Sequence, residues 1–188
     1  MDVAQIAKVY AQLTPPLWLV TAAEGDRRGG LIATTVAQAS NVSEMPRQLI
    51  TVDKRHNTHA LIEGSGAFAM HLIGETQLDL VWRFGLQSGH DVDKFAGLQF
   101  RTGATGSPLL PEALAWFDCR VEARMDSGDR TVYLAAVIDG RLGRTDPPLT
   151  SRRFFQIAPP DKQKIMNEQY EHDARLDAVS IQEWRDKK

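Results

Sequence analysis

The chain has little cysteine, little net charge and no long hydrophobic run. Its single cysteine, Cys119, cannot form a disulfide within the chain, which is consistent with a reducing cytoplasm. The formal net charge of -2 argues against a surface built for nucleic acid. No stretch approaches the ~18 apolar residues of a membrane-spanning helix, and the polar first residues do not resemble a signal peptide. We therefore expect a cytoplasmic protein without a nucleic-acid or membrane partner.

Several common catalytic and metal-binding patterns are also missing. The G-x-S-x-G pattern of serine hydrolases is absent, and the segment 64–66 (GSG) lacks the third glycine of a dinucleotide-binding fingerprint. His56 and His59 are three positions apart, but no second pair of ligands stands nearby. We therefore expect neither a Rossmann domain nor a metal site.

The 188 residues are 43% hydrophobic and 24% charged, which is ordinary for one globular domain. Apolar periodicity predicts helices over residues 3–13, 58–63 and 75–84. No regular alternation of strand and helix is present, so the pattern favours a mainly β, antiparallel barrel with inserted helices. The expected strands, two pairs of which form hairpins, are residues 17–23, 31–39, 48–53, 67–73, 113–125, 131–142 and, as a short addition, 154–157.

The last part of the chain differs in composition from the rest. Residues 161–188 are highly polar, with apolar side chains too frequent for a free tail and too sparse for a core. We expect a barrel domain over residues 1–160 and a C-terminal helical arm over residues 161–188. The arm would pack on the barrel or on a second subunit.

Residues 30–58 contain the most informative pattern. The expected strand over residues 31–39 ends in small and hydroxyl-bearing residues, which let backbone amides approach a flat ligand closely. The next strand runs into Lys54 and Arg55, a basic pair that suits a phosphate. That loop then enters a helix, whose free N-terminal amides favour an anion.

A purely structural interpretation of the same residues stays open. Residues 54–58 are also typical of a solvated turn, in which Asn57 or Thr58 caps the following helix. Arg130 could be a polar residue at the start of a strand and nothing more. Neither pattern alone decides between a ligand site and an ordinary loop.

The segment 30–58 resembles the flavin reductase-like family, the FMN-binding split barrels. In that family a strand ending in TA-x-x-x-S-x-S and a later K-x-x-x-T loop hold the flavin ring and phosphate. Here Ala33-Thr34-Thr35, Gln38-Ala39-Ser40 and the segment 54–58 stand at these positions.

The resemblance covers roughly residues 14–142. It implies a six- to seven-stranded antiparallel split β-barrel of Greek-key type. The cofactor-binding residues that it implies are Thr34, Thr35, Gln38, Ala39, Ser40, Asp53, Lys54, Arg55, Asn57, Thr58 and Phe84.

The resemblance also implies a function. It indicates a flavin-binding oxidoreductase with FMN as cofactor, FAD being the other flavin to consider, and NAD(P)H as reductant. Hydride would pass through flavin N5, and a monooxygenase, oxygen or another acceptor would take the electrons. No catalytic side chain is required, and family members are homodimers.

Two departures from the family pattern motivate alternatives. Gln38 stands where the family has a small residue, and Arg130 follows Gly128 and Asp129 where many reductases have histidine. Arginine stays charged, so Arg130 would contact a nicotinamide phosphate or carboxylate instead of acting as an acid or base. A non-catalytic flavin carrier, sensor or electron-transfer module is therefore the second hypothesis. A barrel that has lost flavin and only mediates contacts is the third.

Overall fold

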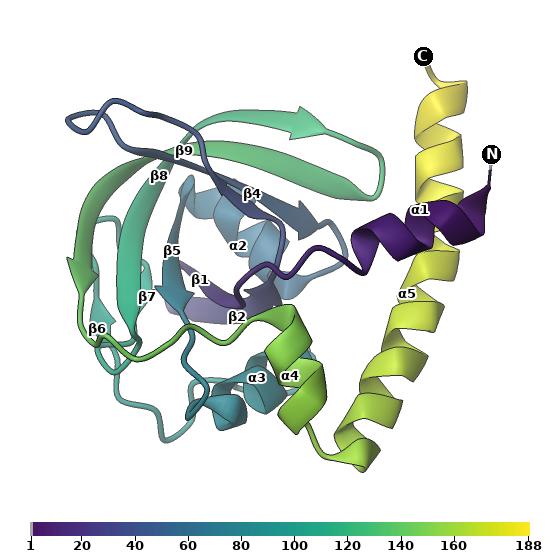
Figure 1. The fold of residues 1–188 in the computed structure, drawn as a ribbon. Helices are drawn as coiled ribbons and strands as arrows, with labels where there is room; N and C mark the ends of the chain where they lie inside the picture. Colours follow the sequence, from purple (N-terminus) through teal and green to yellow (C-terminus); the bar gives the residue numbers. More distant parts are fainter. Residues whose placement is uncertain (1) are drawn as a thin grey trace.

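A seven-stranded antiparallel sheet forms the body of the structure, a computed structural model that describes residues 2–188 (Figure 1). The sheet has the order β2-β1-β5-β8-β9-β4-β3 and curls into a half-barrel, and a separate two-stranded sheet pairs β6 with β7. The predicted split barrel is therefore confirmed. The strands are β1 (Trp18–Glu24), β2 (Arg27–Ala33), β3 (Val36–Gln38), β4 (Arg47–Asp53), β5 (Ala67–Leu72), β6 (Arg101–Thr102), β7 (Pro108–Leu109), β8 (Ala115–Asp126) and β9 (Arg130–Leu142).

Both predicted hairpins are present. β1 and β2 pair from Trp18 opposite Ala33 to Glu24 opposite Arg27. The β8–β9 hairpin turns at Gly128, whose φ of 100° lies in a region that favours glycine. One predicted strand was too long: residues 31–39 form β2 and β3, with a break after Ala33.

Residues 2–188 contain five helices beside the sheet, and four of them agree with the predicted segments. The fifth helix, α4, was not predicted: the short strand expected over residues 154–157 is wrong, because these residues are part of α4. The hydroxyl of Thr150 caps that helix by accepting from the amide of Arg153 at 3.2 Å, and Phe154 is buried beneath it. The helices are α1 (Val3–Tyr10), α2 (Asn57–Ser65), α3 (Leu78–Gly85), α4 (Ser151–Ile157) and α5 (Pro160–Asp186).

The core has two main apolar clusters, because successive side chains of a strand point to opposite faces of the sheet. Val20 of β1 belongs to the cluster that α2 covers inside the barrel. Leu19, its neighbour, belongs to the cluster that α3 and α4 cover on the other face, with Phe84 and Phe154. β1 thus has a buried residue on each face, which explains its continuous apolar sequence.

The fully buried His71 connects β1 and β5 to the loop after β7. Its ring nitrogens lie 3.0 Å from the carbonyl oxygen of Leu19 and 3.1 Å from the amide nitrogen of Leu110. Burial lowers the pKa of His71 to about 4. The neutral ring can therefore donate to the carbonyl and accept from the amide.

The two terminal helices lie outside this core. Neither α1 nor α5 contains a buried residue. Figure 1 shows α5 as a long helix along one side of the barrel. None of the helices in residues 2–188 is long and apolar enough to cross a membrane.

Candidate functional site

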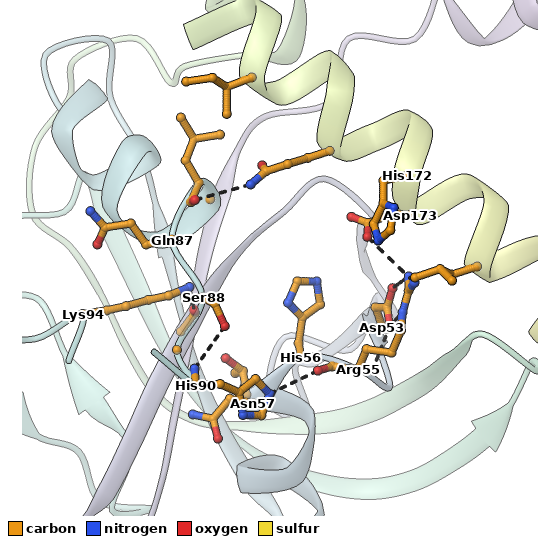
Figure 2. Close-up of a pocket in the computed structure, with 18 of the residues that line it drawn as sticks. Asp53, Arg55, His56, Asn57, Gln87, Ser88, His90, Lys94, His172 and Asp173 are labelled. Atoms are coloured by element: carbon orange, nitrogen blue, oxygen red, sulfur yellow. Dashed lines mark hydrogen bonds and ion pairs between the residues drawn. The ribbon is translucent and has the colours of Figure 1, made fainter. Parts of the chain in front are cut away.

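A cavity of about 530 Å³ lies between the barrel and α5. Its walls come from the β4–α2 loop, the loop after α3, and one face of α5 (Figure 2). A smaller cavity of about 90 Å³ adjoins it at the end of β2, and the two cavities share Asp53 and His56. This pair of cavities is the candidate site.

The β4–α2 loop is held by the buried carboxylate of Asp53. One oxygen of Asp53 accepts from the backbone amide of Arg55 at 2.8 Å, and the amide of His56 donates to the Asp53 carbonyl oxygen at 3.2 Å. His56 is the N-cap residue of α2, but its side chain makes no capping hydrogen bond. The first turn of α2 therefore presents its amides to the cavity without a side-chain cap, which suits an anionic ligand.

Arg55 is the principal cation of the cavity. Its guanidinium contacts Asp53 of the loop and Asp177 of α5, and it lies 3.8 Å from Asp173 of the same helix. The hydrogen bond with Asp53 raises the pKa of Arg55, which is therefore charged throughout the usual pH range. Burial alone would raise the pKa of Asp53, but the hydrogen bonds from Arg55 outweigh burial and hold that pKa below its ordinary value.

The adjacent Lys54, the other cation of the predicted phosphate clamp, points away from the cavity. Its ammonium group lies 2.5 Å from a carboxylate oxygen of Asp126 and 2.8 Å from the carbonyl oxygen of Gly128. Lys54 thus ties the β4–α2 loop to the β8–β9 hairpin. The structure brings Arg55 into the cavity and leaves Lys54 outside it.

Asn57 and Thr58 of α2, two of the predicted cofactor-binding residues, line the cavity. They approach β2 closely because Gly29 has no side chain: a Cβ atom there would lie 3.0 Å from the side-chain nitrogen of Asn57. The Asn57 side-chain oxygen also accepts from Arg27 at 3.3 Å, so this side chain is held in place. Glycine in β2 thus positions the start of α2 at the site.

Lys94 forms part of the opposite wall and is buried. Its ammonium group donates to the carbonyl oxygens of Gly30 at 3.0 Å and Phe84 at 2.9 Å. Burial lowers the pKa of Lys94 to about 8. Phe84, a predicted cofactor contact, lies in the core beneath Gly30, where its ring leaves no room for a Cβ atom on that glycine.

The remaining predicted residues lie around the end of β2. Thr34 and Thr35 are exposed and line the smaller cavity. Gln38, Ala39 and Ser40 lie on and after the edge strand β3, outside both cavities; the Gln38 amide donates to the carbonyl oxygen of Ser40 at 2.7 Å. The structure thus separates the predicted ring contacts into a group at the cavity and a group on the exposed edge.

Arg130, where the chain departs from the family pattern, borders the smaller cavity. Its guanidinium lies 3.0 Å from a carboxylate oxygen of Asp129 and 2.9 Å from one of Asp177. Asp177 therefore connects Arg130 with Arg55. Burial raises the pKa of Asp177, and the two arginines oppose that rise.

Several cavity residues were not predicted from the sequence. They include His56, Lys94, the loop residues Gln87, Ser88 and His90, and the α5 residues Gln169, His172 and Asp173 (Figure 2). The sequence offered some indication of two of these residues. His56 stands within the predicted phosphate clamp, and Lys94 lies next to the apolar Phe95 in a loop. The α5 residues gave none, because their place depends on where the arm docks.

The side chains present suit a flavin with a phosphate. The uncapped start of α2, the Thr58 hydroxyl and the Arg55 guanidinium are all donors, as a phosphate requires. The smaller cavity has the hydroxyls of Thr34 and Thr35 and the apolar side chains of the β2 end beside it. The acids that oppose an anion here are Asp53, which is paired with Arg55, and the acids of α5.

Comparison with known proteins identifies the family. The model of the family described as "Flavin reductase like domain" matches residues 10–158. The chain is 30% identical over 152 residues to high molecular weight rubredoxin of Moorella thermoacetica, covering 80% of this chain and 66% of that protein. It is 29% identical to the ferric-chelate reductase (NAD(P)H) of Archaeoglobus fulgidus, covering 76% and 85%. The structure of nitrilotriacetate monooxygenase component B from Mycobacterium thermoresistibile is similar, with 28% identity, a TM-score of 0.68 and coverage of 79% and 82%.

The chain therefore belongs to the flavin reductase-like family. This membership confirms the predicted family. The chain spans just under two thirds of the first of these relatives. Helix α5 lies beyond the residues that the family model matches.

Proposed function

We propose that the protein binds FMN in the cavity between the barrel and α5 and acts as an NAD(P)H-dependent flavin reductase. The observation that carries this proposal is the donor set around one cavity, namely the uncapped start of α2, Thr58 and Arg55. Family membership supports the same ligand class.

The proposal gives a role to most of the residues that the sequence predicted as cofactor contacts. Arg55 pairs with the phosphate through a planar set of donors, and Asp53 fixes the orientation of that guanidinium. Asn57 and Thr58 add a side-chain amide and a hydroxyl at the start of α2. Thr34 and Thr35 face the ring from the end of β2. Gln38, Ala39 and Ser40 would reach the ring from the exposed edge.

A bound flavin would supply the redox chemistry, which is hydride transfer from NAD(P)H and electron transfer to an acceptor. The protein has to bind the two nucleotides, orient them and limit water at the ring. None of these tasks requires a general acid or base from the protein. Arg130 borders the smaller cavity, which the proposal assigns to the flavin ring, and there it would contact the nicotinamide nucleotide.

The electron acceptor is proposed from the relatives. The similarity to component B of a monooxygenase supports transfer of reduced flavin to a monooxygenase. The ferric-chelate reductase supports a metal chelate as another acceptor class. FMN is preferred over FAD because FAD has a second phosphate. The main cavity offers one principal cation, Arg55, and the acids Glu168 and Asp173 lie beside it.

A non-catalytic flavin carrier is the second candidate, and the state of Arg130 favours it. Arg130 is paired with Asp129 and Asp177, so its charge is already matched before any nucleotide binds. A carrier would bind FMN without accelerating its reduction. The reductase and the carrier therefore differ in one measurable step.

We also propose a homodimer in the cytoplasm, built from a flavin-binding domain of residues 1–160 and an arm of residues 161–188. Exposed apolar side chains on both terminal helices support the dimer, among them Val9, Tyr10, Tyr170 and Val179. The free, buried Cys119 and the use of NAD(P)H support the cytoplasm.

Anaerobic mixing of protein, FMN and each nicotinamide separates these possibilities. A reductase would bleach the visible absorbance of FMN faster with NADH or NADPH than buffer does. Binding of FMN without faster bleaching would establish the carrier instead. Absence of FMN binding would contradict both proposals.

A further inference from the structure

Two acids of α5 occupy the position that the proposed function gives to a phosphate. Asp177 contacts Arg55 and lies 2.9 Å from Arg130, and Asp173 lies 3.8 Å from Arg55. The Asp177 side chain is only 14% exposed. Its carboxylate therefore fills the space between the two guanidinium groups as an anionic ligand would.

The charges of this cluster decide whether another anion can bind. With α5 docked, the guanidinium groups of Arg55 and Arg130 face four carboxylates, which belong to Asp53, Asp129, Asp173 and Asp177. The cluster then has an excess of negative charge, which repels a phosphate. Without the two acids of α5 the charges balance, and both arginines gain free donors.

The attachment of α5 is suited to release. The helix has 27 residues, none of them buried, although Met166 is partly buried against the core cluster that α3 and α4 cover. The apolar burial that holds α5 against the barrel is therefore small. Polar contacts are prominent instead, such as that from the Gln169 amide to the Leu86 carbonyl oxygen at 3.4 Å. Extended backbone at Ala158 and Pro159 separates α5 from the anchored α4.

One packing contact near the end of α5 carries no charge. Gly128 in the β8–β9 turn lies against Ile181 and Trp184, so closely that a Cβ atom there would be 3.0 Å from the Cβ of Trp184. Trp184 is also partly buried, so removal of its indole ring offers a way to loosen α5 without changing the acids.

We propose that α5 is a displaceable gate, in which Asp173 and Asp177 occupy the anion site of Arg55 and Arg130 until a phosphate-bearing flavin replaces them. This inference rests on the proposed function for the identity of the ligand. The gate lowers the apparent affinity for flavin, because only molecules in which the two acids of α5 have moved away from the arginines can bind the phosphate.

Flavin affinity in three full-length variants tests the gate. Asp177→Asn should bind FMN about tenfold or more tighter than the wild type, because the competing charge is gone. Trp184→Ala should also bind more tightly, since it loosens α5 while both acids remain. Glu171→Gln removes an exposed carboxylate from the same helix, away from the arginines, and should bind like the wild type.

Equal or weaker FMN binding by Asp177→Asn would overturn the gate while leaving the proposed function intact. Tighter binding by Asp177→Asn together with unchanged binding by Trp184→Ala would also overturn it. That outcome would make Asp177 a fixed negative charge of the site and not part of a moving helix.

Hydrogen exchange of the α5 amides tests the gate without flavin. Asp177→Asn should exchange these amides faster than the wild type and Glu171→Gln. Inorganic phosphate should speed exchange in the wild type relative to chloride at equal ionic strength. Unchanged exchange in both comparisons would contradict the gate. Faster exchange with phosphate in a protein that binds no FMN would support the gate and contradict the proposed flavin function.

Discussion

The ammonium group of Lys94 donates to the carbonyl oxygen of Gly30 at 3.0 Å, across 64 positions of sequence. A second hydrogen bond, to the carbonyl oxygen of Phe84, connects the same lysine to the end of α3. Lys94 thus joins β2, α3 and the following loop at one wall of the main cavity. Its hydrogen bonds hold that wall in place before any ligand is present.

Replacing Lys94 by methionine should therefore destabilise the fold. The methionine fills similar space but donates no hydrogen bond, so two backbone carbonyls lose their donor. We expect a loss of about 1 to 3 kcal/mol in the free energy of unfolding, measured by urea denaturation. Lys8→Met, on the exposed face of α1, is the matched control and should change stability by less than about 0.5 kcal/mol.

Arg55 and Lys54 should differ sharply in their effect on flavin binding. Arg55→Ala removes the principal cation of the cavity and should weaken FMN binding by about 1.5 to 3 kcal/mol. Lys54→Ala breaks contacts with Asp126 and Gly128, outside the cavity, and should leave the dissociation constant within about threefold. Fluorescence titration of FMN measures both constants. Equal losses in the two variants would mean that Lys54 turns toward the phosphate on binding.

Much of the fold was predictable because strand patterns and turn residues are local signals. The hairpins around Gly25 and Gly128 follow apolar runs of the expected length, and both turns place glycine at positive φ. The short α4 was missed because its apolar residues also suit a strand. The structure identifies the segment as a helix through its N-cap at Thr150 and the burial of Phe154 in the core.

The site was predictable only in part. The sequence placed Arg55, Asn57 and Thr58 together, since a strand that runs into a helix has a definite local geometry. It could not show that Lys54 turns toward the β8–β9 hairpin, because the partner Asp126 is 72 positions away. The docking of α5, which brings Asp177 to the site, depends on tertiary contacts that no local pattern encodes.

The pKa of Asp53 predicts a pH dependence of stability. Hydrogen bonds from Arg55 hold this pKa below its ordinary value of 3.8, so the ionised form stabilises the folded state. That contribution is present above the ordinary value and is lost as the pH falls through the lower folded value. Asp53→Asn should be less stable than the wild type by about 1 to 3 kcal/mol at neutral pH, and the difference should shrink in acid. Asp26→Asn, in an exposed turn, should show no such trend in urea denaturation.

The exposed apolar face of α1 predicts a subunit contact. Val9 and Tyr10 are 63% and 68% exposed, which is unusual for neighbouring large side chains unless a partner covers them. Light scattering should give the mass of a dimer for the wild type and a lower mass for the double variant Val9→Ser with Tyr10→Ser. The control Lys8→Ser should remain dimeric. A monomeric wild type at micromolar concentration would contradict the proposed dimer.

The central claim is that the cavity at Arg55 and the start of α2 holds the phosphate of a flavin. Comparing the dissociation constants of FMN and riboflavin tests it most directly, because riboflavin has the same ring and ribityl chain but no phosphate. The wild type should bind FMN at least about tenfold more tightly than riboflavin, a difference of about 1.4 kcal/mol. This preference should disappear in Arg55→Ala and persist in Lys54→Ala. Equal affinity of the wild type for FMN and riboflavin would contradict the account.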